Sequence, residues 1–183
     1  MKTIGALLAS FLFAVCAVAV ETPSDSLYVV PFEWKDQAGR SLDMSSFKGK
    51  PVVLTLAYTK CKTACPLTMQ RIKNVAGALK NKVPDAQFVI VSLDPKNDTP
   101  ETLAKFKEQY KLDDARWHLL TGSEADVRKL AVLLGYSFQQ QAGDGEIAHS
   151  NKIFGLDKEG RIATELEGLG SDIAPFVGEV TRF

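Results

Sequence analysis

The sequence predicts a single α/β sandwich, because buried strands alternate with amphipathic helices and a hairpin follows them. An apolar run over residues 52–57 is typical of a buried strand, and helical periodicity begins at Pro66. A second apolar run over residues 88–93 precedes a helix that starts at Pro100. Nearer the C-terminus, two short apolar segments flank a turn over residues 157–160.

The elements ahead of the first buried strand suggest a small β-hairpin. Its arms are residues 28–34 and the segment after the turn sequence Ala38-Gly39-Arg40. The strand over residues 52–57 is then followed by a helix over residues 66–82. That helix should bury one face, which carries Leu67, Ile72, Val75 or Ala76, and Leu79.

The second half of the chain continues the alternation. The helix from Pro100 should turn Leu103, Phe106 and Tyr110 inward, and a strand follows at residues 117–120. Ser123 and Asp126 have capping-box spacing for a third helix, which should end near Gly135. The late hairpin pairs residues 153–156 with residues 162–166, and a final helix follows. We therefore expect a thioredoxin-like sandwich with an N-terminal β-hairpin and a late β-hairpin.

Residues 1–19 have the features of an export leader. Lys2 precedes a largely apolar stretch, and Ala17-Val18-Ala19 offers small residues for cleavage. An uncleaved membrane anchor is the main alternative, since about 17 apolar residues can just span a bilayer. Lipid attachment at Cys16 is disfavoured by the bulky Val15 before it. The expected organisation is a leader (1–19), a polar tether (20–27) and one domain (28–183), placed in the periplasm or another extracytoplasmic compartment.

The charge balance excludes one class of partner. The chain has 22 basic and 22 acidic residues, a pI near 6.7 and no run of lysines or arginines, so nucleic-acid binding is not expected. Cleavage near Ala19 would leave Cys61 and Cys65 as the two remaining cysteines. An exported thiol pair meets an oxidising environment, so it must cycle with a reductant or be protected by a metal.

Cys61 and Cys65 lie at the turn between the first buried strand and the first helix, in the segment 58–66. Because proline is well tolerated at the first helical position, Pro66 places Cys65 at or near the N-cap. The positive end of the helix, together with Lys60 and Lys62, should lower the thiol pKa of this pair.

These two thiols and His149 can together make a copper site. Thiolates suit Cu(I), and an imidazole extends the site to Cu(II), whereas a closed structural zinc site would need four protein ligands. The alternative is a structural disulfide between Cys61 and Cys65, although so short a loop gains little stabilisation from a crosslink.

Four motifs in order resemble the Sco/SenC family of copper-binding, thioredoxin-like assembly factors. They are Tyr58-Thr59-x-Cys61-x-x-x-Cys65-Pro66, Ser92-Leu93-Asp94-Pro95-x-x-Asp98-Thr99-Pro100, Leu120-Thr121-Gly122 and His149-Ser150. The resemblance implies that Cys61, Cys65 and His149 bind copper. It also implies assistance in metallating or reducing the binuclear copper centre of cytochrome c oxidase, with an oxidase subunit and a thiol reductant as partners.

The chain departs from the family pattern beside two of these ligands. Many members have Pro-Asp after the first cysteine and an acidic residue before the histidine, where this chain has Lys62-Thr63 and Ala148. The site is therefore less acidic than is usual, which concerns copper affinity and partner choice more than the ligand set.

Other polar candidates have mainly structural interpretations. Asp94 and Asp98 suit turn and capping roles, with orientation of His149 or tuning of a thiol as the alternative. His118 lies outside the family ligand set and is expected at the surface or in a hydrogen bond. Met69 and Phe106 fit helix faces and are assigned to the core.

Two classes of function remain open from the sequence. One is a metallochaperone that passes copper to a cuproenzyme, and the other is an extracytoplasmic thiol-disulfide reductase that uses Cys61 and Cys65 as a redox-active pair. His149 favours the first, because a pure reductase has little use for an imidazole near its thiols. Peroxidase activity ranks last, since Leu54 and Tyr58 stand where a peroxidase carries proline and threonine.

Overall fold

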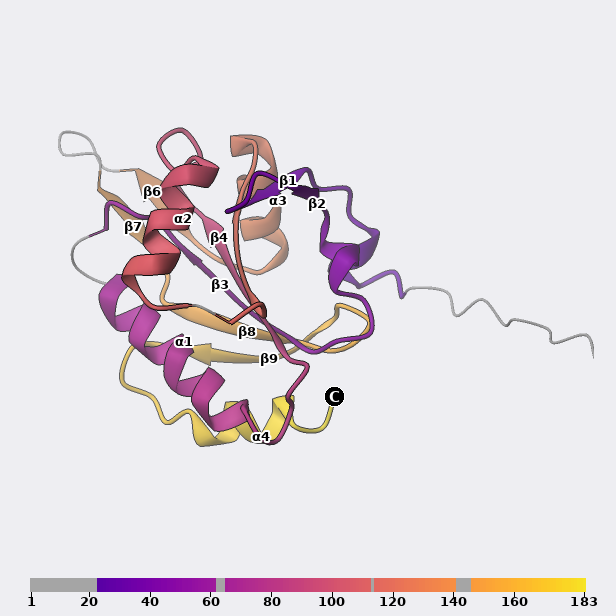
Figure 1. Cartoon of the computed structure of the whole chain (residues 1–183). Coiled ribbons are helices and arrows are strands. Elements are labelled where there is room, and N and C mark those ends of the chain that lie inside the picture. Colours follow the sequence, from indigo (N-terminus) through magenta and orange to yellow (C-terminus); the bar gives the residue numbers. More distant parts are fainter. Residues whose placement is uncertain (1–22, 62–64, 113, 141–145) are drawn as a thin grey trace, which may run out of the picture.

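A computed structural model describes residues 23–61, 65–112, 114–140 and 146–183. Its centre is a seven-stranded sheet in the order β2-β1-β5-β4-β3-β8-β9, beside which β6 and β7 form a separate two-stranded sheet (Figure 1). The strands are β1 (Trp34–Asp36), β2 (Ser41–Leu42), β3 (Val52–Ala57), β4 (Gln87–Ser92), β5 (Trp117–Thr121), β6 (Phe138–Gln140), β7 (Ile147–His149), β8 (Lys152–Leu156) and β9 (Ile162–Glu167).

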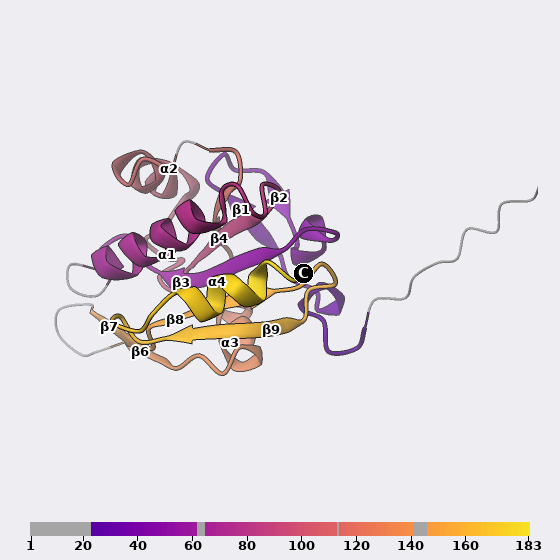
Figure 2. The same ribbon diagram turned by 90° about the horizontal axis from the view of Figure 1, so that it is seen from below.

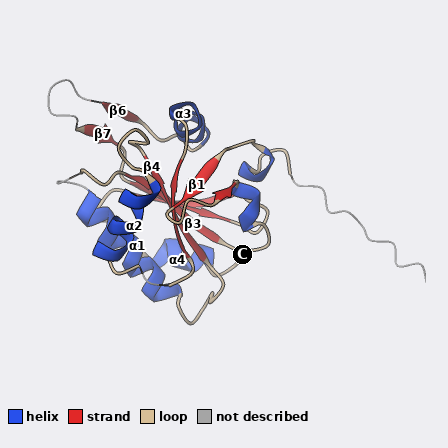
Figure 3. Cartoon of the chain, turned by 45° about the horizontal axis from the view of Figure 1, so that its top comes forward, coloured by secondary structure: helices blue, strands red, loops and turns tan. Residues whose placement is uncertain are grey.

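Helices cover both faces of the large sheet. They are α1 (Cys65–Leu79), α2 (Pro100–Gln109), α3 (Glu124–Leu133) and α4 (Ala174–Val180), with short 3-10 turns η1 (Leu27–Val29) and η2 (Met44–Phe47) near the N-terminus. Two views show α1, α2 and α4 on one face and α3 on the other (Figures 2 and 3). The predicted α/β sandwich is therefore confirmed.

The central strands are parallel, and antiparallel strands flank them. β3 pairs with β4 and β4 with β5 in parallel, so α1 and α2 are the crossover connections. On the other side β8 pairs antiparallel with β3 and with β9, which is the predicted late hairpin. All six residues of β3 and all six of β4 are buried, as their continuous apolar sequences predict.

The N-terminal hairpin is shorter than predicted and lies later in the chain. Its strands β1 and β2 pair Trp34 with Leu42, whereas Tyr28, predicted to begin the first arm, lies in the 3-10 turn η1. Ser26 caps that turn by accepting the N–H of Tyr28, and Pro31 lacks an N–H for a strand ladder. The leader predicted over residues 1–19 lies outside the described residues. The end of the predicted tether, Ser26 and Leu27, is buried.

The helix faces follow the prediction, with one error. Met69, Ile72, Val75, Ala76 and Leu79 are buried on α1, and Leu103 and Phe106 are buried on α2. Leu67 was predicted to face the core and is 57% exposed. It lies two residues from both Cys65 and Met69, a separation that turns it away from the face on which they lie. Helix α1 also ends at Leu79, three residues before the predicted end.

Two motifs that the sequence analysis named have clear structural roles. Ser123 caps α3 by accepting the N–H of Asp126, which confirms that the capping signal starts a helix. Gly122 follows β5, where a Cβ atom would lie 2.6 Å from Cε3 of Trp34 and 2.9 Å from the carbonyl oxygen of Glu33. Glycine is therefore required for the close approach of these two segments.

The small sheet of β6 and β7 was not predicted. Its strands have three residues each and pair Phe138 with His149. Such short segments carry too little alternation to be recognised as strands, yet β7 ends at His149 and so places one of the candidate ligands. No helix in the described part of the chain is long and apolar enough to span a membrane.

Candidate metal site

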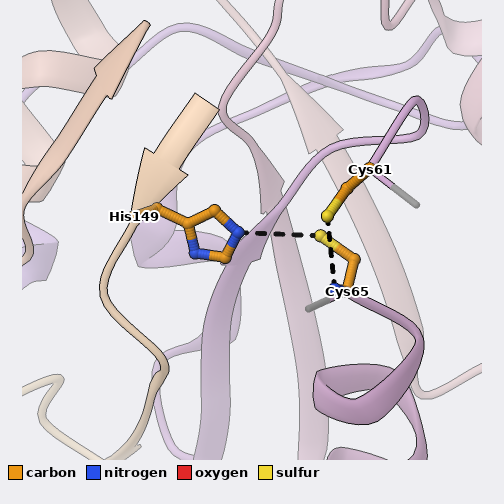
Figure 4. Close-up of side chains that lie close together, drawn as sticks. All are labelled: Cys61, Cys65 and His149. Carbon is orange, nitrogen blue, oxygen red and sulfur yellow. Dashed lines mark hydrogen bonds between the residues drawn. The ribbon is translucent and has the colours of Figure 1, made fainter. Parts of the chain in front are cut away.

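The two cysteines flank the start of α1. Cys61 follows the end of β3, and Cys65 is the first residue of the helix, so the strand and the helix together fix their separation. Neither forms a disulfide in the structure, and their exposed fractions are 9% and 0% respectively. The backbone N–H of Cys65 donates a hydrogen bond to Sγ of Cys61 over 3.3 Å (Figure 4). The helix N-terminus is therefore directed at the sulfur of Cys61.

His149 approaches the cysteines from the opposite side, at the end of β7 (Figure 4). Its Nε2 lies 3.8 Å from Sγ of Cys65. The ligand atoms of Cys61, Cys65 and His149 all lie within 4.8 Å of one another. The structure thus brings together all three side chains that the sequence analysis selected, although Cys65 and His149 are 84 positions apart in the chain.

The other ring nitrogen of His149 is held by oxygen atoms. Nδ1 lies 2.8 Å from the carbonyl oxygen of Ser150 and 2.9 Å from the hydroxyl of Tyr136. A carbonyl oxygen can only accept, so Nδ1 carries the proton and Nε2 presents its lone pair to the thiols. This is the tautomer that a metal ligand needs at Nε2.

The thiol of Cys65 does not have the lowered pKa that we predicted. Burial raises the pKa of Cys65 well above its ordinary value, and a hydrogen bond with Cys61 adds to the rise, although a backbone N–H of Tyr58 opposes it. The prediction assigned the effect of the helix N-terminus to both thiols of the pair. The backbone N–H of Cys65 instead donates to the sulfur of Cys61. Because Cys65 is fully buried, ionisation of its thiol carries the full desolvation cost of a thiolate.

Two tyrosines enclose the imidazole of His149. The ring of Tyr58 meets it edge-on, with centroids 6.0 Å apart, and the ring of Tyr136 lies nearly parallel to it at 6.1 Å. The hydroxyl of Tyr58 also accepts the backbone N–H of Ile147, two residues before His149. Burial raises the pKa of Tyr58 to about 12 and raises that of Tyr136 as well, so both hydroxyls stay protonated. The sequence analysis missed Tyr136, which no motif marks.

Asp98 supports the site through Thr59. Its fully buried carboxyl accepts hydrogen bonds from the hydroxyl of Ser92 (2.6 Å) and from both the hydroxyl (2.5 Å) and the N–H (3.2 Å) of Thr59. Thr59 lies two residues before Cys61, so these bonds fix the chain that leads to that thiol. Asp94 instead accepts hydrogen bonds from the side chain of Asn97 and shapes the turn. In the described residues, neither carboxylate is hydrogen bonded to His149.

His118 lies outside this group. Its Nε2 is 2.9 Å from the side-chain oxygen of Gln87, and its ring meets Phe47 edge-on. Burial, helped by the positive charge of Lys107, lowers the pKa of His118 to about 4. It is therefore a neutral, hydrogen-bonded histidine, as the sequence interpretation expected.

A hollow of about 880 Å³ gives access to the site from the side of Cys61. Its lining includes Tyr58, Lys60, Cys61, Pro66, Tyr110 and Glu146. Cys65 and His149 are not part of that lining. A partner that enters the hollow would therefore meet Cys61 first.

A family model described as SCO1/SenC matches residues 20–182 of the chain. The chain belongs to the SCO1/SenC family. The sequence resemblance and the thioredoxin-like fold class are both confirmed by this match and by the solved structures that are similar to the chain.

Three solved structures show what the chain is similar to. A SCO1/SenC family lipoprotein from Bacillus anthracis str. Ames has a TM-score of 0.78 and 26% identity, over 90% of this chain and 98% of its own. ScoI of Bradyrhizobium japonicum, solved with copper bound, has a TM-score of 0.70 and 25% identity, over 84% and 97%. BsSco, described as a member of the Sco family of cytochrome c oxidase assembly proteins and as having a disulfide switch, has a TM-score of 0.70 and 25% identity, over 88% and 96%.

Proposed function

We propose that this protein is a copper chaperone that binds one copper ion through Cys61, Cys65 and His149. The observation that carries the proposal is the convergence of two thiols and one imidazole within 4.8 Å of one another. Two soft sulfur ligands and one nitrogen ligand suit Cu(I) and Cu(II), and carboxylates, which suit harder ions, are absent from this group in the described part of the chain. The copper-bound relative from Bradyrhizobium japonicum supports the same choice of metal.

The surroundings of each ligand suit acquisition and release of copper. The amide of Cys65 stabilises negative charge on the sulfur of Cys61, and the Nδ1–H of His149 fixes the lone pair of Nε2 toward the thiols. Three protein ligands leave coordination positions for an incoming ligand, so copper can pass to a recipient without first dissociating. Cys61 lines the hollow and is the thiol best placed to meet that recipient.

The proposed recipient is a cuproenzyme outside the cytoplasm, and specifically the binuclear copper centre of a cytochrome c oxidase subunit. The description of BsSco as a relative of oxidase assembly proteins supports this choice. The apolar N-terminal sequence supports export, with residues 1–19 as a leader or anchor, and the lipoprotein from Bacillus anthracis supports attachment to a membrane. A thiol reductant would keep Cys61 and Cys65 reduced in that compartment.

The second candidate is a thiol-disulfide reductase, which is favoured by two neighbouring thiols that are not joined in a disulfide. The thiolate of Cys61 would attack a disulfide of the cuproenzyme and form a mixed disulfide with one sulfur, while the other leaves as a thiolate. Cys65 would then lose its proton and attack the sulfur of Cys61, which displaces the substrate sulfur bonded to Cys61 as a thiolate. The substrate is left as a dithiol and this protein as a Cys61–Cys65 disulfide. An external dithiol would restore it.

Copper titration of the reduced protein tests the proposal. We expect saturation at about one copper per chain and a thiolate-to-copper charge-transfer band with Cu(II). Cys61→Ser and Cys65→Ser should abolish that band, whereas His118→Ala removes a histidine outside the site and should leave it unchanged. Absence of saturable binding by the reduced protein would refute the chaperone function and leave the reductase as the better proposal.

A further inference from the structure

Tyr136 links the strand that leads to the cysteines with the strand that carries His149. Its hydroxyl lies 2.9 Å from Nδ1 of His149 and 3.3 Å from the carbonyl oxygen of Leu56 in β3. The carbonyl oxygen of Ser150 can only accept a hydrogen bond, so Nδ1 of His149 carries a proton. A protonated Nδ1 cannot accept from Tyr136, so Nδ1–H is shared between the carbonyl oxygen of Ser150 and the hydroxyl oxygen of Tyr136, and the hydroxyl of Tyr136 donates its own proton to the carbonyl oxygen of Leu56.

The carbonyl of Leu56 lies just past the end of a strand ladder. The last pair between β3 and β8 joins Thr55 to Ile153, so Leu56 is one residue beyond it. The chain of donors thus runs from Nδ1–H of His149 to the oxygen of Tyr136, and from the hydroxyl of Tyr136 to Leu56. In this chain Nδ1–H donates, the hydroxyl of Tyr136 both accepts and donates, and the carbonyl of Leu56 accepts, so the roles of adjacent groups are complementary.

The position of Tyr136 is itself well fixed. It follows the end of α3, where Gly135 has a positive φ of 58° and the N–H of Tyr136 donates to the carbonyl of Ala131. Its side chain is 5% exposed and packs near the ring of Phe154. The hydroxyl of Tyr136 is therefore held in place before copper binds, so copper binding loses little conformational entropy in ordering this side chain.

We propose that Tyr136 is the positioning residue that holds the imidazole of His149 in its Nδ1–H tautomer with Nε2 aimed at the two thiols. The inference rests on copper binding by Cys61, Cys65 and His149. The carbonyl of Ser150 belongs to the next residue and turns with the histidine, whereas Tyr136 comes from a different element and anchors the ring to β3. Without the hydroxyl, Nδ1–H keeps the carbonyl of Ser150 as an acceptor, but the ring loses its hydrogen-bonded connection to β3, so its orientation and its preference for the Nδ1–H tautomer should both weaken.

The test compares wild type with Tyr136→Phe, which keeps the ring and removes only the hydroxyl. Tyr28→Phe is the matched control, because the ring of Tyr28 lies beside Gly160, outside the copper site, and its hydroxyl has no hydrogen-bond partner among the described residues. In the copper-free protein, ¹⁵N chemical shifts of the imidazole report which nitrogen of His149 carries the proton. We expect the Nδ1–H form in wild type and in Tyr28→Phe, and a mixture of both tautomers in Tyr136→Phe.

Copper affinities complete the test. Loss of a group that orients a metal-binding histidine typically costs about 10- to 100-fold in affinity, and we expect such a loss for Cu(II) in Tyr136→Phe. The affinity for Cu(I) should change little, because two thiolates can hold that ion. Unchanged tautomers, or an unchanged Cu(II) affinity, would overturn the inference. If Tyr136→Phe does not fold, the tautomer of His149 in wild type remains a test, because an Nε2–H tautomer in wild type contradicts the inference. Failure of wild type to bind copper would instead refute the proposed function.

Discussion

The backbone N–H of Cys65, the first amide of α1, donates to the sulfur of Cys61 and not to the thiol of Cys65 itself. This relationship divides the pair into two chemically different thiols. Cys61 lines the hollow and receives a hydrogen bond that stabilises a thiolate, while Cys65 is fully buried and its pKa is raised by that burial. Cys65 is therefore a protonated thiol at neutral pH.

Copper affinity should consequently rise with pH. A thiolate is the metal ligand, so copper binding must release the proton of Cys65 at any pH below its raised pKa. Each proton released makes the apparent affinity rise about tenfold per pH unit. Competition titrations between about pH 6 and pH 8 measure this slope, and Cys65→Ser should reduce it. An affinity that does not change with pH would show that Cys65 is not a ligand or is already ionised.

His149→Ala should separate copper binding from thiol chemistry. The variant removes the imidazole and leaves both thiols and the start of α1 intact, so Cu(II) affinity should fall strongly and Cu(I) affinity much less. Reduction of a model disulfide should persist if Cys61 and Cys65 alone perform it. Oxidase assembly in cells then decides between the two candidate functions.

Loss of oxidase assembly by His149→Ala with thiol activity retained would support copper delivery. His118→Ala is the control for that experiment, since His118 is hydrogen bonded to Gln87 and lies outside the ligand group. Normal assembly by His149→Ala would mean that the imidazole is structural, and the reductase would then be the preferred function.

The sequence predicted which three side chains the structure brings together better than it predicted their environment. Cys61, Cys65 and His149 belong to recognisable motifs, and the buried strand before Cys61 has a strong apolar signal. The raised pKa of Cys65 could not be predicted, because burial depends on how β3, α1 and β7 pack around it. The contact of Tyr136 with His149 could not be predicted for a similar reason, because the pairing of two three-residue strands brings the hydroxyl of Tyr136 to the imidazole.

In the fold, too, features with a strong local sequence signal were predicted and features that depend on competing local interactions were not. Long apolar runs predicted β3, β4 and the late hairpin, and a side-chain cap predicted the start of α3. The first arm of the N-terminal hairpin was misplaced, because the capping of η1 by Ser26 competes locally with the strand that Tyr28 and its neighbours resemble. Leu67 was assigned to the core from its hydrophobicity, although helix geometry places it on the exposed face.

Oxidation should join Cys61 to Cys65 and abolish copper binding. Their sulfur atoms already lie within 4.8 Å of each other, and the disulfide would consume both thiolate ligands. Titration of the protein before and after treatment with an oxidant measures the loss, and a subsequent dithiol reductant should restore binding. If the oxidised protein binds copper as tightly as the reduced one, the two sulfurs are not ligands.

Asp98→Ala should weaken both the fold and the copper site. The substitution leaves three donors from Ser92 and Thr59 without their acceptor in a buried place, which should cost about 2–4 kcal/mol of unfolding free energy. Copper affinity should also fall, because Thr59 holds the chain before Cys61. Asp94→Ala is the control and should change stability by no more than about 0.5 kcal/mol, since Asp94 is partly exposed and accepts its hydrogen bonds from an exposed asparagine. Urea unfolding and copper titration of the two variants measure both effects.

Stability should decline in mild acid because of His118. Its pKa is about 4 in the folded protein and near 6.5 in an unfolded chain, so the unfolded state binds more protons between these values. The contribution of the neutral ring is therefore complete above about pH 6.5 and is lost as the pH falls toward about 4. Because the ring is partly exposed, solvent screening reduces the expected loss to roughly 1–2 kcal/mol.

The measurement is the free energy of unfolding of wild type and His118→Gln across this pH range. Glutamine has no titrating group and keeps an N–H that can donate to Gln87, so the difference between the two proteins isolates the protonation of His118. Wild type should lose stability relative to the variant as the pH falls from about 6.5 to about 4, and the difference should then stay constant. A difference that does not depend on pH would show that the ring of His118 is hydrated enough to protonate in the folded state as readily as in the unfolded chain.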